Sequence, residues 1–126
     1  MSSSRQKLAA TTIGNYALFG GGDSAGSSSA VVDAYDTSLT RTTAASLSTA
    51  RHLLAATTVG DYALFGGGGT AVDAYDTSLT RTTPTALSKR KFNLAATTIG
   101  NYALFGGGGP GWAGDESAVV DAYTVI

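Results

Sequence analysis

The chain has 126 residues, a net charge of −1, no cysteine, an apolar share of 43% and a charged share of only 13%. This balance predicts a packed protein. The near-zero charge argues against nucleic acid or an anionic membrane surface as a partner. Without cysteine, disulfides and thiolate metal sites are excluded. No stretch resembles a signal sequence or a membrane span, so we expect a cytoplasmic protein by default.

The sequence repeats itself three times. The segment "LAATTIGNYALFGGG" begins at Leu8 and again at Leu94, and "LAATTVGDYALFGGG" begins at Leu54. A second block, "VDAYDTSLTRTT", occupies residues 32–43 and 72–83, and "VDAY" returns at residue 120. The "AATT" blocks start at residues 9, 55 and 95, so the repeats are 46 and 40 residues apart. A period of this length predicts that each repeat is one supersecondary unit.

Each repeat reads as a series of short strands. "LAATTIG" and "NYALFGG" are rich in β-branched and aromatic residues and are too short for buried helices. The pairs Gly14-Asn15, Gly60-Asp61 and Gly100-Asn101 predict two-residue hairpin turns with positive φ. "AVVDAYD" predicts a third strand and "LTRTTAASL" a fourth. Helical periodicity is absent, the nearest candidate being "TAASLSTARHLLAA".

Four antiparallel strands repeated at 40 to 46 residues are typical of a β-propeller blade. We therefore expect an all-β fold with about three blades per chain, in one domain over residues 1–126. Blade one would occupy residues 5–48, blade two 49–88 and an incomplete blade three 89–126. A β-solenoid is the alternative architecture, but its coils are usually shorter and the hairpin turns argue against it.

The repeats resemble the kelch family. Kelch blades have a basic residue before the first strand, a di-glycine closing the second strand and a Tyr-Asp ending the third. The matching residues are Arg5, Arg51, Lys91, Gly20-Gly21, Gly66-Gly67, Gly106-Gly107, Tyr35-Asp36 and Tyr75-Asp76. The third repeat has Tyr123-Thr124, and the Trp that follows the Tyr in kelch blades is replaced by Arg41 and Arg81. The resemblance implies a propeller with one face that binds partner proteins.

Three blades do not close a ring, and each open end would expose an apolar blade face. We expect oligomerisation to complete the ring, with a homodimer giving six blades as the favoured form. One alternative is a structural subunit of a fibre or virion-like assembly that accepts a strand from a neighbour. Another is a designed or truncated propeller fragment without a biological ligand.

The sequence offers no catalytic set. "GDSAG" at residues 22–26 resembles a nucleophile loop, but the only histidine is His52, and a polar loop is the better interpretation. The "GGGG" runs at residues 66 and 106 lack the lysine and the helix of a phosphate loop. Aspartates recur at two positions of the repeat: Asp33, Asp73 and Asp121 at one, and Asp36 and Asp76 at the other. We interpret them as turn caps or partners of Arg41 and Arg81, not as calcium ligands. The expectation is a non-enzymatic protein without cofactor or metal.

The repeats differ mainly in the insert after the di-glycine. The inserts span residues 23–30, 69–70 and 110–117, and the last, "PGWAGDES", holds the only Trp of the chain. Antiparallel order places these inserts on the same face as the links between blades, and variable loops on a rigid scaffold commonly bind ligands. The predicted binding face contains Asp23, Arg51, His52, Lys89, Arg90, Lys91, Trp112, Asp115 and Glu116. We expect a protein or peptide ligand, with a sugar stacked on Trp112 as the alternative. Trp112 packed as a loop plug or subunit contact is the purely structural interpretation.

Overall fold

The fold is all-β and built from antiparallel sheets. The computed structural model describes residues 1–112 and 114–124, and within them every regular element is a β-strand. The first sheet has the order β1 (Ala9–Ile13), β2 (Tyr16–Gly20), β5 (Val32–Tyr35) and β6 (Arg41–Thr43). The second has the order β7 (Leu54–Val59), β8 (Tyr62–Gly67), β9 (Val72–Tyr75) and β10 (Arg81–Thr82). The third contains β11 (Ala95–Ile99), β12 (Tyr102–Gly106) and β13 (Val120–Thr124), and β3 (Asp23–Ser24) pairs with β4 (Ser27–Ser28).

The expected all-β class and the expected strand order within each repeat are therefore confirmed. Each "VDAY" segment pairs with the second strand of its own repeat, as in the register of Leu18 with Ala34 and Leu64 with Ala74. The described residues include no helix with the length and hydrophobicity that a membrane crossing requires.

The hairpin turns lie where the glycines predict them. Ile13 pairs with Tyr16, which leaves Gly14 and Asn15 as a two-residue loop with φ of +54° at the glycine. Gly60 and Gly100 have the same φ sign, with values of 55° at both positions. Positive φ at the first loop position alone matches a type II′ turn, which follows the twist of the flanking strands. Glycine adopts this conformation without the steric cost of a Cβ.

The fourth strand is shorter than "LTRTTAASL" predicts. It covers only three residues in β6 and two in β10. Beyond β6 the chain still runs beside β5, since the Ala44 N–H donates to Val32 O and the Leu47 N–H donates to Ala30 O. Regular pairing ends there, and the Leu47 side chain is buried in the first core. The turn before the strand is capped by Asp36, whose Oδ1 accepts from the N–H groups of Ser38 and Thr40 at 2.9 and 3.0 Å. The expected turn-cap role of Asp36 is thus confirmed.

Another difference is in the first insert, expected to be a loop. Asp23 pairs with Ser28 to form the small hairpin β3–β4. Ala25 and Gly26, with φ of 52° and 84°, form its turn. Two positive φ values in succession are the signature of a type I′ hairpin turn. The sequence signal was weak because alanine seldom occupies such a position.

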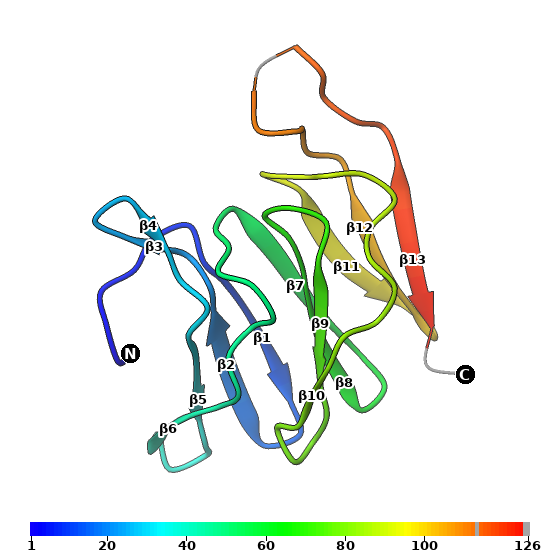
Figure 1. The fold of residues 1–126 in the computed structure, drawn as a ribbon. Helices are drawn as coiled ribbons and strands as arrows, with labels where there is room; N and C mark the ends of the chain where they lie inside the picture. The colour runs from blue at the N-terminus through cyan, green and yellow to red at the C-terminus, as the bar shows by residue number, and fades with distance from the viewer. Residues whose placement is uncertain (113, 125–126) are drawn as a thin grey trace.

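The three main sheets are arranged side by side through their first strands. In Figure 1, β7 lies between β1 and β11, and the contacts between these strands agree. Hydroxyl groups join the strands across the gaps: Thr11 Oγ1 lies 2.7 Å from Thr58 Oγ1, and Thr57 Oγ1 lies 2.7 Å from Thr98 Oγ1. The small alanine and threonine side chains let these strands approach closely.

Each main sheet has an aromatic face and an aliphatic face. The aromatic faces carry Phe19 and Tyr35, Phe65 and Tyr75, and Phe105 and Tyr123. The aliphatic faces carry Ile13, Leu18, Gly20 and Val32 in the first sheet, Val59, Leu64, Gly66 and Val72 in the second, and Ile99, Leu104, Gly106 and Val120 in the third.

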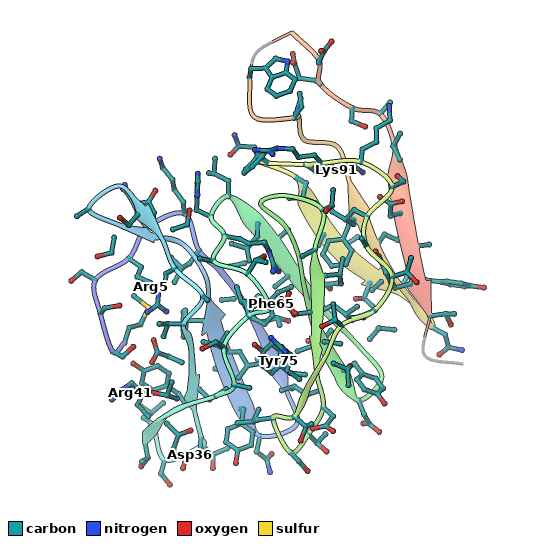
Figure 2. All side chains as sticks on the ribbon, in the orientation of Figure 1. Arg5, Asp36, Arg41, Phe65, Tyr75 and Lys91 are labelled. Atoms are coloured by element: carbon teal, nitrogen blue, oxygen red, sulfur yellow. The ribbon has the colours of Figure 1, made fainter. Side chains whose placement is uncertain are left out.

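The two cores form where an aliphatic face meets the aromatic face of the next sheet. Phe65 and Tyr75, in the middle of the molecule in Figure 2, pack against the aliphatic face of the first sheet. Phe105 packs in the same way against the second sheet. A Cβ on Gly20 would lie 2.8 Å from the Phe65 ring, and one on Gly66 would lie 2.8 Å from the Phe105 ring. Each phenylalanine ring therefore rests directly on a glycine.

Candidate functional site

The aliphatic face of the third sheet is uncovered in the described structure. Ile99 is 69% exposed, whereas its counterparts Ile13 and Val59 are 2% and 1% exposed. Val120 is 59% exposed, whereas Val32 and Val72 are fully buried. The same residue types that form the core in two sheets thus form a surface in the third. Such a contiguous apolar patch is a feature of interaction sites.

The aromatic face of the first sheet is the other open face. Phe19 and Tyr35 are half-buried, whereas Phe65 and Tyr75 are fully buried. The rings nevertheless keep one geometry, since the Phe19–Tyr35 centroids are 5.9 Å apart at 89° and the Phe65–Tyr75 centroids 5.8 Å apart at 85°. The face is therefore preformed. Because β7 lies between β1 and β11, the two open faces are at opposite ends of the row of sheets (Figure 1).

A buried ion pair recurs in every repeat, close to the di-glycine. Arg51 Nη1 lies 2.8 Å from Asp73 Oδ2, Arg5 Nη2 lies 3.0 Å from Asp33 Oδ2, and Lys91 Nζ lies 3.4 Å from Asp121 Oδ2. The arginine also donates to main-chain carbonyls, as Arg51 does from Nε to Gly67 O and from Nη2 to Phe65 O. The basic residue thereby ties the link between sheets to the second and third strands.

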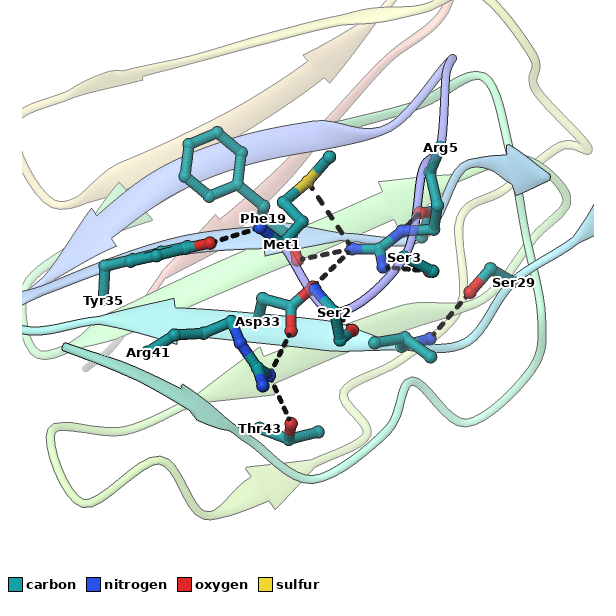
Figure 3. Close-up of polar contacts among 12 residues, drawn as sticks. Met1, Ser2, Ser3, Arg5, Phe19, Ser29, Asp33, Tyr35, Arg41 and Thr43 are labelled. Atoms are coloured by element: carbon teal, nitrogen blue, oxygen red, sulfur yellow. Dashed lines mark hydrogen bonds and ion pairs between the residues drawn. The ribbon is translucent and has the colours of Figure 1, made fainter. Parts of the chain in front are cut away.

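The carboxylate of this pair accepts several further hydrogen bonds. Asp33 Oδ2 accepts from both the N–H and the hydroxyl of Ser2, and Oδ1 lies 3.2 Å from Arg41 Nη1 (Figure 3). Burial raises the pKa of Asp33, but the bonds from Ser2 and Arg5 outweigh it and hold the pKa below its ordinary value. The predicted Arg41–Asp33 contact is thus present, although Arg5 is the partner that the sequence reading missed.

The second repeat departs from this pattern. Arg81 Nη1 donates to Ser46 O at 3.1 Å, so the expected pairing of Arg81 with Asp73 is wrong. Asp73 Oδ1 is buried without a hydrogen-bond partner among residues 1–112 and 114–124. The hydroxyl of the neighbouring Tyr75 donates to Ala45 O at 2.7 Å, and burial raises the pKa of Tyr75. The link before the second sheet therefore supplies the carbonyl oxygens that accept hydrogen bonds from Arg81 and Tyr75.

The loop end of the second and third repeats contains a cleft of about 660 Å³. Phe92 lines this cleft, with its ring centroid 5.9 Å from that of His52 and 4.9 Å from the Arg90 guanidinium carbon. Trp112 and Glu116 line the cleft on the insert side. A second cleft of about 410 Å³ shares Arg90, Trp112 and Glu116 with the first and adds Lys89 and Asp115.

Six of the nine predicted binding residues therefore come together at this end of the molecule: His52, Lys89, Arg90, Trp112, Asp115 and Glu116. The other three do not. Arg51, Lys91 and Asp23 are only 2%, 0% and 6% exposed. Arg51 and Lys91 are engaged with Asp73 and Asp121, so their side chains stabilise the sheets and do not face a ligand.

Sequence reasoning missed Phe92 and Asn93, which also line the larger cleft. The available signal was repeat comparison: the position of Phe92 is His52 in the second repeat and Gln6 in the first. Gly111 completes the arrangement, because a Cβ there would lie 3.3 Å from the Phe92 ring.

The insert of the first repeat forms a Ser–His contact with the second repeat. Ser28 Oγ lies 2.8 Å from His52 Nδ1. In the part of the chain that the structure describes, no carboxylate hydrogen-bonds His52, so the orienting acid of a catalytic triad is not supplied there. Nor do three His, Cys, Asp or Glu side chains gather in those residues as metal ligands would.

The sequence matches no protein-family model, and no curated protein matches it at a significant level. The open faces and the loop end are therefore the features of the molecule that bear on its function.

Proposed function

We propose that the chain is a non-enzymatic, kelch-like β-propeller module whose function is protein–protein interaction, beginning with a second copy of itself. The observation that carries the proposal is the complementarity of its two open faces. One is the aromatic face of the first sheet and the other the aliphatic face of the third. These are the two kinds of face that already pack together twice within the chain.

The internal contacts specify how a second copy would dock. Phe65 rests on Gly20 and Phe105 rests on Gly66, so Phe19 of one copy would rest on Gly106 of the other. Nothing in the described structure obstructs this, since the nearest atom to a Cβ on Gly106 belongs to the exposed Val120. The interface would continue an existing one with the same residue types.

The threonine contacts between the first strands of neighbouring sheets would continue to a second copy in the same register. Thr11 meets Thr58, and Thr57 meets Thr98, so Thr97 of one copy would meet Thr12 of the next. Thr97 and Thr12 are both exposed in the described structure. Polar contacts of this kind add little affinity, but they fix the register of an otherwise apolar contact.

The kelch resemblance supports the ring form of this assembly. Its basic residue and its di-glycine act together here, because Arg51 donates to the carbonyl oxygen of Gly67 while it pairs with Asp73. Propellers commonly have about four to eight blades. Two chains with three sheets each would give six and would cover every open face by a two-fold operation.

The solution mass tests the proposal directly. Sedimentation velocity should show a species of twice the 12.6 kDa chain mass that persists on dilution. Ile99→Asp should reduce it to a monomer, because a charge in a buried apolar contact is costly. Asn15→Asp is the control: it adds the same charge at a hairpin turn where the second repeat already has Asp61.

A mixing experiment distinguishes a contact between the aromatic and the aliphatic face from a contact between two like faces. Phe19→Ala damages only the aromatic face and Ile99→Asp only the aliphatic face, so each variant alone should be monomeric. Mixed, they retain one intact pair of faces and should form a 1:1 complex. A wild-type monomer at all concentrations would overturn the proposal and would favour further repeats of a longer chain as the covering partner. Open-ended species that grow with concentration would overturn the closed ring.

A further inference from the structure

The residues that distinguish the third repeat gather in one place. The framework positions are nearly identical in all repeats, but Arg90, Phe92 and Trp112 have no counterpart of the same type. All three line the 660 Å³ cleft together with His52 and Glu116. None of these residues belongs to the aromatic or aliphatic faces that the assembly would cover.

The cleft is held open by an ordered frame. The Phe92 N–H donates to Gly109 O at 2.7 Å and the Gly109 N–H donates back to Phe92 O at 3.0 Å. Arg90 Nε donates to Pro110 O at 3.2 Å while its guanidinium stacks on Phe92. On the insert, the Gly114 N–H donates to Glu116 Oε2 at 2.9 Å. Gly109 and Pro110, where the insert begins, are thus bonded to Phe92 and Arg90, and a backbone frame held in this way suits a binding site.

The cleft presents flat apolar and flat polar groups side by side. Trp112 is 64% exposed and lines the same cleft as Phe92. The two Nη atoms of Arg90 have no hydrogen-bond partner in residues 1–112 and 114–124, and the Asn93 amide also lines the site. Lys89 and Arg90 are offset by Asp115 and Glu116, so the site carries little net charge. These are the features expected for a neutral ligand with apolar faces and many hydroxyl groups.

The geometry points to a neutral oligosaccharide as the ligand of this cleft, with a pyranose ring stacked on Trp112 and its hydroxyl groups bonded to Arg90, Asn93 and Glu116. A pyranose has a C–H face that packs on an indole and equatorial hydroxyls that pair with planar polar side chains. Binding of a peptide by strand addition is disfavoured, because no residue lining the cleft belongs to a strand whose edge could extend a main-chain ladder. The balance of two cations and two carboxylates favours neither an anionic nor a cationic ligand.

Trp112 is the only tryptophan, so its fluorescence reports directly on the cleft. Titration with maltohexaose, cellohexaose, xylohexaose and chitohexaose should give a saturable blue shift with at least one of them, as stacking removes water from the indole. Calorimetry should then show binding about tenfold weaker in Arg90→Ala and in Trp112→Ala, which corresponds to one lost stacking or hydrogen-bonding contact. Trp112→Phe should retain most of the affinity. Asn15→Asp, at the opposite end of the strands, should bind like the wild type.

The same titrations on Ile99→Asp separate this inference from the proposed assembly, since that variant changes only the aliphatic face. Equal affinity in wild type and Ile99→Asp is the expected result. No response to any of the four saccharides would overturn the inference, and so would binding that survives Trp112→Ala. A response confined to acidic or aromatic peptides would also overturn it and would assign the cleft to a protein partner.

Discussion

At the scale of single residues, each repeat buries a basic–acidic pair, and hydrogen bonds make this burial possible. Taking charges out of water is costly unless their hydrogen-bonding capacity is filled. Arg51 meets this condition with bonds to Gly67 O, Phe65 O and Asp73. Lys91, with fewer donors, bonds to Val119 O at 2.7 Å and lies near Asp121. Each repeat therefore has a basic–acidic pair, but the arginine donates more hydrogen bonds than the lysine.

This difference leads to a graded prediction for Arg51. Replacement by leucine would leave the Asp73 carboxylate buried without its cation, and we expect a loss of about 3–5 kcal/mol in the free energy of unfolding. Arg51→Lys keeps a cation, as Lys91 does, but loses carbonyl contacts, so a loss of about 1–2 kcal/mol is expected. Urea unfolding followed by circular dichroism measures both.

The control is Arg81→Ala, because Arg81 is half-buried, forms no ion pair among the described residues and donates to Ser46 O. Its cost should stay below about 1 kcal/mol. Equal losses for Arg51→Leu and Arg81→Ala would contradict a structural role for the buried pair.

At the scale of elements, the sequence specified the hairpins because their turn chemistry is local. Gly14-Asn15 and its two counterparts define a turn that needs only its own two residues. The same holds for the Tyr-Asp turn that Asp36 caps. The end of the short fourth strand could not be predicted from local sequence. It depends on the burial of the Leu47 side chain in the core between the first and second sheets.

The site shows the same division between local and distant causes. Sequence reasoning placed the inserts and links at one end and so brought His52, Arg90, Trp112 and Glu116 together. It also assigned Arg51 and Lys91 to this face, since they belong to the links, although both side chains are buried. Their aspartate partners lie beyond inserts of different length, so no constant spacing revealed the pairs.

Packing between sheets gives a prediction at this scale for two equivalent glycines. A Cβ at Gly66 would lie 2.8 Å from the buried Phe105 ring, so Gly66→Ala should destabilise the chain by about 1–3 kcal/mol through overpacking. A Cβ at Gly106 meets only Val120, at 3.1 Å, and that side chain is exposed. Gly106→Ala should therefore change stability by less than about 0.5 kcal/mol in the Ile99→Asp background.

Thermal unfolding of the two variants in that background measures the difference. In the otherwise wild-type chain, Gly106→Ala should instead weaken self-association, because Phe19 of the second copy is expected to rest there. Comparable destabilisation at both glycines in the Ile99→Asp background would contradict this prediction, because it would mean that packing against a neighbouring sheet does not set the cost of the added Cβ.

At the scale of the whole molecule, the three sheets form a row with two cores and two open faces. A small chain with few core layers is marginally stable, since apolar burial only slightly exceeds the cost of ordering the backbone. Exposed Ile99 and Val120 in the third sheet leave a third core unformed. Folding and assembly would therefore be linked through the same apolar contact.

This linkage predicts a melting temperature that depends on protein concentration. Binding that involves only the folded state adds free energy that grows with the logarithm of partner concentration, about 2.7 kcal/mol at a hundredfold excess over the dissociation constant. The wild-type melting temperature should therefore rise by several degrees over a hundredfold increase in chain concentration. Ile99→Asp should melt at one temperature throughout, and Asn15→Asp should follow the wild type. A concentration-independent wild-type transition would mean that the open faces add nothing to stability, and that the two sheet-to-sheet cores within one chain are sufficient for its fold.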